Sequence, residues 1–143
     1  MARQVAAAGV RVDGIAELHR ALKKIDPALE KELKRANKSI AQFVADDARA
    51  AAYSLGGVAA KVAPSVKANA GSGWAGISLG GSAYPMAGGA EFGAYQYHQF
   101  KPWRGNSSDA GYFMYPAIRQ DADRIETEYK DAADAAIRKA GLA

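Results

Sequence analysis

Hydrophobic positions recur at helical spacing in three stretches of the chain. The first runs from Ile15 to Ile25, with apolar residues every three or four positions. Asp26 ends this helix, because a residue that precedes proline avoids helical geometry, and Pro27 suits the first turn of a second helix. The stripe of this first helix consists of Ile15, Leu18, Leu22 and Ile25.

Two longer stretches predict the main helices. The second helix continues for about seven turns to Leu55 and stops at the glycine pair 56–57. The last helix follows Tyr115–Pro116 and ends at Gly141. The inward positions are rich in alanine: Leu29, Leu33, Ala36, Ile40, Phe43, Ala48, Ala51 and Leu55 in the second helix, and Ile118, Ala122, Ile125, Tyr129, Ala132, Ala136 and Ala140 in the last.

Alternating apolar positions and glycine-rich turns predict strands between these helices. The segments 65–70 and 73–80 form an expected hairpin around the turn 71–73, and 9–14 is a further short strand closed by Asp-Gly. A short helical turn is predicted over 58–62. The predicted fold is therefore α+β, with two long helices, in the N-terminal half and at the C-terminus, packed on a small antiparallel sheet.

Length and composition fit one domain over 1–143. The chain has 143 residues, of which 24% are charged and 49% hydrophobic, as expected of a globular protein. Its apolar runs are shorter than the roughly 20 residues that a spanning helix needs. The first residues lack the apolar core of a secretory signal. We therefore expect a cytosolic protein that has no membrane partner.

The sequence offers few groups that could hold a metal. Cysteine is absent, which excludes disulfides and thiolate ligands. His19 and His98 lie about eighty residues apart and lack the spacing of zinc ligands, so each is expected to be a packed or surface side chain. No metal is predicted.

Motifs for catalysis or cofactor binding are equally weak. The segment 71–76 reads G-x-G-x-x-G, but strand-like sequence follows it where a phosphate site needs a helix. The serines include no G-x-S-x-G motif, and no nucleophile has an identifiable base. We expect no catalytic residues, no cofactor and no enzymatic activity.

Charge is unevenly distributed along the chain. Residues 1–71 hold 12 basic and 7 acidic side chains, and residues 72–143 hold 7 and 8. The simplest interpretation is a solvated helix surface. The alternatives are a subunit contact between a basic and an acidic helix, or a nucleic-acid-binding module that uses the basic N-terminal half. The candidate residues are Lys31, Lys34 and Lys38 on the basic helix and Asp121, Glu128 and Asp131 on the acidic one.

Aromatic residues gather between residues 83 and 103, in a segment whose glycines argue against a helix. Aromatic side chains in irregular sequence are typical of protein interfaces, because they bury much area at little entropic cost. The alternative is that they cover the domain's own core. The candidate interface residues are Tyr84, Glu91, Phe92, Tyr95, Tyr97, Phe100, Trp103 and Arg104.

Several motifs in order resemble the tail-completion, or neck, protein family of long-tailed bacteriophages. They are "VDGIAELHRALKKI", the long alanine-rich helix, "VAPSVKANA", "GGSAYPMAGGAEFGA" and "MYPAIRQDADRIETEYKDAADAAIRKA", and together they span almost the whole chain. The family pattern matches at Tyr84, Ala87, Glu91-Phe92-Gly93 and Pro116-Ala117. The chain departs from it after Pro64, where the Thr-Gly of many relatives is missing.

The resemblance implies a structural virion protein that joins the head-to-tail connector to the tail tube. It implies a homo-oligomeric ring of six subunits, with head-side connector or stopper proteins and tail terminator or tail tube proteins as partners. Genomic DNA would pass through the lumen without specific binding. The location would be the neck or tail of the virion, and the host cytoplasm during assembly. A tail-terminator ring protein is the alternative within this class.

Three further expectations follow. A positive partner or backbone amides should hold Glu91, since an unpaired carboxylate is costly to desolvate; Arg104 and Arg119 are the nearest candidate partners in sequence. Residues 98–112 should form a projecting loop that becomes ordered against a neighbour. The alanine-rich helices predict a marginally stable subunit that is a monomer or weak oligomer alone. The charges of the basic and acidic helices should find their partners only in the ring.

Overall fold

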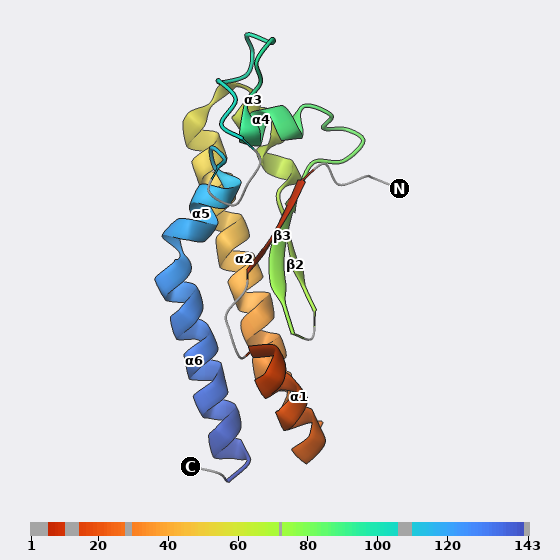
Figure 1. The fold of residues 1–143 in the computed structure, drawn as a ribbon, viewed down its shortest axis with the longest axis vertical. Coiled ribbons are helices and arrows are strands. Elements are labelled where there is room, and N and C mark those ends of the chain that lie inside the picture. The colour runs from red at the N-terminus through yellow and green to blue at the C-terminus, as the bar shows by residue number, and fades with distance from the viewer. Residues whose placement is uncertain (1–5, 11–14, 28–29, 72, 106–109, 142–143) are drawn as a thin grey trace.

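The long helix α2 (Glu30–Leu55) forms the axis of the molecule and contacts both the sheet and α6 (Ala122–Lys139) (Figure 1). This computed structural model describes residues 6–10, 15–27, 30–71, 73–105 and 110–141. The remaining elements, in chain order, are β1 (Ala6–Val10), α1 (Ile15–Ile25), α3 (Gly57–Val62), the 3-10 turn η1 (Ala63–Ser65), β2 (Lys67–Ala70), β3 (Ala75–Leu79), α4 (Ala87–Phe92) and α5 (Met114–Gln120).

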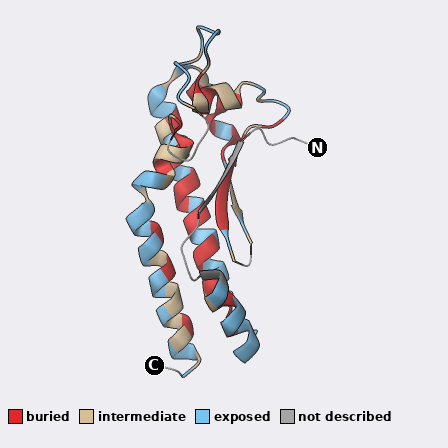
Figure 2. Cartoon of the chain, in the orientation of Figure 1, coloured by how far each residue is buried: buried red, intermediate tan, exposed pale blue. Residues whose placement is uncertain are grey.

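Apolar residues recur at helical spacing along α2, which explains which side of this helix faces the core. Its buried positions include Leu33, Ile40 and Val44, whereas Lys31 and Lys38 on the other side are exposed. Figure 2 shows buried positions of α2 and α6 on the sides where the two helices meet. Alanine at several of these positions lets the helices approach closely, and α6 contributes Ile125, Tyr129 and Ala136 to the buried set.

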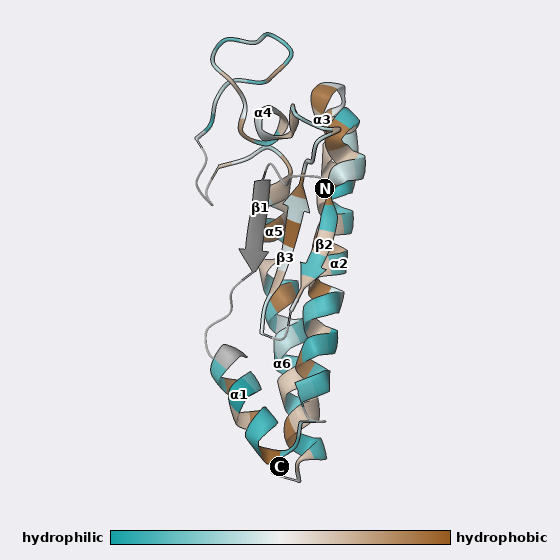
Figure 3. Cartoon of the chain, turned by 90° about the vertical axis from the view of Figure 1, so that its right-hand side faces the viewer, coloured by the Kyte–Doolittle hydropathy of each residue, from teal (hydrophilic) through white to brown (hydrophobic). Residues whose placement is uncertain are grey.

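The sheet has three antiparallel strands in the order β1–β3–β2. Its central strand β3 pairs Ile77 with Ala8 on one side and with Ala68 on the other. Ile77 and Leu79 belong to the core beside α2, which explains why the sheet lies on this helix. In Figure 3 strands β2 and β3 face the viewer, and none of the described helices lies in front of them.

Most of the predicted elements are confirmed. The α+β class, the first helix, the long second helix, the short helix after the glycine pair and the hairpin are all present. The hairpin turn closes with a 3.0 Å hydrogen bond from the amide of Gly71 to the carbonyl of Trp74. None of the described helices has the length and apolar character that crossing a bilayer requires.

Three predicted boundaries are wrong. The N-terminal strand is Ala6–Val10 rather than 9–14, and residues 11–14 lie outside the described part. The last helix begins earlier, at Met114, because Pro116 falls in its first turn, where a missing amide costs no hydrogen bond. It is also divided at Asp121, whose ψ of 4° ends α5 before α6 begins.

The segment expected to be irregular contains the short helix α4. Its glycines lower the local helix propensity, and six residues are too few for a helix to be stable alone. Tertiary contacts compensate, since Ala87, Ala90 and Glu91 are all buried.

Candidate functional site

The aromatic loop, residues 93–104, projects from one end of the molecule beyond α3 and α4 (Figure 1). Its two arms are joined by hydrogen bonds from the amide of Ala94 to the carbonyl of Lys101 and from the amide of Arg104 to the carbonyl of Phe92, both 2.9 Å. The amide of Phe100 closes the tip on the carbonyl of Tyr97 at 3.1 Å. The projecting loop therefore consists of residues 93–104 rather than the predicted 98–112. Residues 106–109 lie outside the described part.

The loop presents aromatic side chains to solvent. Tyr95 is 85% exposed, Tyr97 61% and Trp103 38%. The rings support one another: Tyr95 lies 5.9 Å from Trp103, and Trp103 lies 6.4 Å from Phe92, centroid to centroid. These exposures contradict the alternative that all these aromatics cover the core, although half-buried Tyr84 does pack against it.

The base of the loop is fixed by a buried carboxylate. Glu91 is fully buried, and its Oε1 accepts hydrogen bonds from the amides of Tyr112 at 2.7 Å and Phe113 at 2.9 Å. Its Oε2 accepts from the amide of Tyr115 at 2.9 Å. Backbone amides therefore hold the Glu91 carboxylate. This is one of the two arrangements that the sequence predicts, the other being a positively charged partner. Burial raises the pKa of the Glu91 carboxyl above its ordinary value, while the amides act in the opposite direction.

The two candidate arginines bind the same turn from its carbonyl side. Arg104 Nη1 donates to the carbonyl of Gly111 at 3.2 Å, and Arg119 Nη1 donates to the carbonyl of Ala110 at 2.9 Å. The guanidinium of Arg104 also lies 3.7 Å from the ring centroid of Tyr112. Glu91 thus accepts hydrogen bonds from the amides of the turn before α5, while the two arginines donate to its carbonyls, and charge-assisted hydrogen bonds hold the turn on both sides.

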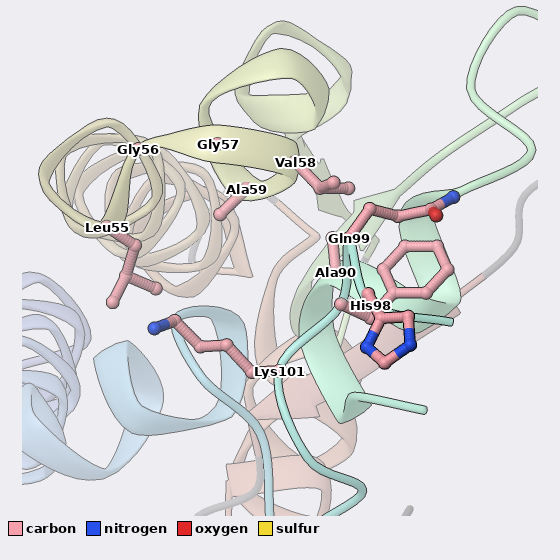
Figure 4. A pocket seen from close by; sticks show the side chains of 10 residues that line it. Leu55, Gly56, Gly57, Val58, Ala59, Ala90, His98, Gln99 and Lys101 are labelled. Atoms are coloured by element: carbon pink, nitrogen blue, oxygen red, sulfur yellow. The ribbon is translucent and has the colours of Figure 1, made fainter. Parts of the chain in front are cut away.

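A small cavity lies between the loop and the junction of α2 with α3 (Figure 4). Its volume is about 200 Å³, and Gly56, Gly57, Phe100 and Lys101 are among the residues that line it. Its described lining residues include no serine, carboxylate or cysteine, and the side chains that could act as a nucleophile or base are Lys101 and the exposed His98.

The structure places the predicted basic and acidic residues on adjacent helices of one chain. Lys31, Lys34 and Lys38 are exposed on α2, and on α6 Asp131 is exposed and Glu128 half-buried. Lys34 Nζ already lies 3.1 Å from Glu30 Oε1, so the expectation that these charges find partners only in a ring is wrong for Lys34. Lys139 Nζ likewise binds Glu32 across the two helices.

Asp121 occupies a different environment from the other acidic residues. It lies at the junction of α5 and α6, and its buried Oδ2 has no hydrogen-bond partner among the described atoms. Burial and the neighbouring carboxyl of Asp47 on α2 raise the pKa of Asp121 to about 6. The sequence does not predict that Asp47 and Asp121 are neighbours, because they lie 74 positions apart on different helices.

The histidines agree with the expectation of packed or surface side chains. His19 is buried, and its Nε2 lies 3.3 Å from Glu30 Oε2, whereas His98 is exposed on the aromatic loop. Within the described ranges, no group of three or more acidic or histidine side chains is arranged to hold a metal ion.

Comparisons with protein-family models, curated proteins and solved structures found no match to this chain. The resemblance to tail-completion proteins therefore remains a prediction from its sequence motifs.

Proposed function

We propose that this chain is a structural subunit of a bacteriophage virion that joins the head-to-tail connector to the tail tube as part of a ring. The observation that carries the proposal is the aromatic loop, which is exposed at its tip and held by hydrogen bonds at its base. A ring subunit of this kind needs no catalytic group. Head-side connector or stopper proteins and tail terminator or tail tube proteins are the proposed partners.

Preorganisation favours a binding role for the loop. Exposed Tyr and Trp side chains are the residues that most often dominate the energy of protein interfaces. A loop whose backbone is already ordered loses little further entropy when it binds. Glu91 supplies that order, because its three amide contacts fix the turn that supports the loop.

Assembly with purified partners tests the proposal. Tyr95→Ser/Tyr97→Ser removes the two most exposed rings without touching the core, and Tyr53→Ser is the matched control, since Tyr53 is 55% exposed on α2. The wild-type chain and the control should form closed rings with connector or tail proteins, as measured by light scattering and electron microscopy. The loop variant should fail to do so. Failure of the wild-type chain to join any such particle would overturn the proposal.

A nucleic-acid-binding module remains the alternative from another class. Lys31 and Lys38 are exposed and available for phosphates. Yet the same helix carries Glu30 and Glu32, which bind Lys34 and Lys139. DNA affinity that falls steeply with salt would favour this alternative over the ring. A tail-terminator subunit would be distinguished by its position in particle images.

A further inference from the structure

The charge of the aromatic loop restricts the surfaces that it can bind. Residues 92–105 contain no carboxylate, and both of their fully charged side chains, Lys101 and Arg104, are cationic and exposed. The exposed rings add further donors in the hydroxyls of Tyr95 and Tyr97 and the indole of Trp103. The loop therefore complements a surface rich in hydrogen-bond acceptors and negative charge.

The chain itself carries such a surface on α6. Residues 121–134 include six carboxylates and two basic side chains, a net charge of −4. We call its four exposed carboxylates, Asp123, Glu126, Asp131 and Asp134, the acidic face; Arg124 and Lys130 are exposed in the same stretch, so its exposed charged side chains sum to −2. Within the part of the chain that the structure describes, none of these four carboxylates forms an ion pair.

The two surfaces cannot meet within one molecule. The aromatic loop lies at one end of the molecule, beyond α3 and α4, whereas α6 runs from α5 toward the opposite end (Figure 1). The inward side of α6 packs on α2 through Ile125 and Tyr129, which turns the carboxylates outward. A contact between the surfaces must therefore join two different copies.

We propose that the aromatic loop of one copy docks on the acidic face of a second copy. Lys101 and Arg104 then lie among carboxylates, while the rings of Tyr95 and Tyr97 cover exposed Ala122 and the aliphatic stems of the acidic side chains. The contact is heterologous, since the two surfaces differ, and repetition of it produces a ring or a filament. The inference rests on the proposed function, for which it names a second copy of this chain as the partner of the loop.

Sedimentation velocity of two variants and their mixture tests this contact. The loop variant is Tyr95→Ser/Tyr97→Ser/Lys101→Glu, and the face variant is Asp131→Lys/Asp134→Lys. Each alone should raise the concentration needed for self-association at least tenfold, because each has lost one half of every contact. Tyr53→Ser and Glu17→Lys, at exposed positions elsewhere, should associate like the wild type.

The mixture gives the decisive result. The loop variant keeps an intact acidic face, and the face variant keeps an intact loop. An equimolar mixture therefore contains one intact loop for every intact acidic face. It should form 1:1 dimers that grow no further, and rising salt should weaken them. A wild-type chain that stays monomeric up to millimolar concentration, or a mixture that stays monomeric, would overturn the inference.

Failure of the inference is distinguishable from failure of the proposed function. If wild-type copies do not associate but the loop variant loses binding to a connector or tail protein, the inference is wrong and the ring function stands. If copies associate through these surfaces but purified phage particles lack the chain, the virion function is wrong and the contact stands. Loss of DNA binding in the loop variant, without any change in self-association, would also overturn the inference.

Discussion

The hydroxyl of Tyr129 on α6 donates a hydrogen bond to Oδ1 of Asn37 on α2. Both side chains are buried, with 2% and 0% exposed. Asn37 Nδ2 in turn donates to the carbonyl of Gly71 in the β2–β3 turn at 3.1 Å. One amide side chain thus connects the two long helices to the sheet, in a core that is otherwise apolar around this point.

Removing the Tyr129 hydroxyl should destabilise the chain. In Tyr129→Phe the buried Oδ1 of Asn37 loses this donor, which should lower the free energy of unfolding by about 1–3 kcal/mol. Tyr53→Phe is the control, because the exposed Tyr53 can exchange its hydrogen bonds with water. Urea denaturation of the two variants measures the difference. Equal stability of Tyr129→Phe and Tyr53→Phe would show that the buried bond contributes nothing.

Glu91 should matter more than any carboxylate on the helix surface. Glu91→Ala leaves the amides of Tyr112, Phe113 and Tyr115 without their acceptor, so unfolding should become easier by about 3 kcal/mol or more. Glu17→Ala, at an exposed position of α1, should change stability by under about 0.5 kcal/mol and leave assembly unchanged. Thermal denaturation and particle assembly are the measurements. Unchanged folding and assembly in Glu91→Ala would refute the role of this site.

Asp121 should make stability depend on pH. Its folded pKa of about 6 exceeds the ordinary value of 3.8, so the folded chain keeps a proton that the unfolded chain releases. Stability should therefore fall as pH rises from about 4 to about 6. Asp121→Asn should remove the contribution of Asp121 to this fall and leave the contribution of the buried Glu91 carboxyl, whose pKa is also raised. It should stabilise the chain above pH 6 by about 1 kcal/mol, a modest gain because solvent screens this partly exposed group.

Asp47→Asn provides the reciprocal test, since it removes the neighbouring charge that raises the pKa of Asp121. It should flatten the same part of the pH profile, measured as melting temperature against pH. A slope that persists unchanged in Asp121→Asn would mean that another group is responsible.

Gly93 should be essential for the shape of the aromatic loop. Its φ of 85° disfavours side chains, and a Cβ there would lie 2.1 Å from the carbonyl oxygen of Pro102 in the opposite arm. Gly105→Ala is a matched control, because its φ is 92° but its Cβ would meet nothing within 4 Å. Gly93→Ala should shift the fluorescence of Trp103 and destabilise more than Gly105→Ala. Similar spectra and stabilities for both variants would contradict the close approach of the two arms.

Local sequence determined most of the secondary structure. The boundaries of α1 and α3, the course of α2 and the hairpin follow from apolar spacing and from Pro27 and the glycine pair 56–57, which act on their immediate neighbours. A set of donors around Glu91 was also foreseeable, because a carboxylate that is desolvated among apolar neighbours must find them. The sequence does not determine which donors Glu91 finds, because arginines and backbone amides both suit a carboxylate.

Tertiary structure decided the features that depend on distant partners. Buried contacts stabilise α4 against the low propensity of its glycines. The amides that bind Glu91 come from residues 21 to 24 positions later, and the pairs Asn37–Tyr129 and Asp47–Asp121 form only because α6 lies against α2. Spacing along a sequence reports which face of an element is apolar, but it does not report which other element covers that face. Which elements pack together is decided by the tertiary contacts of the folded chain.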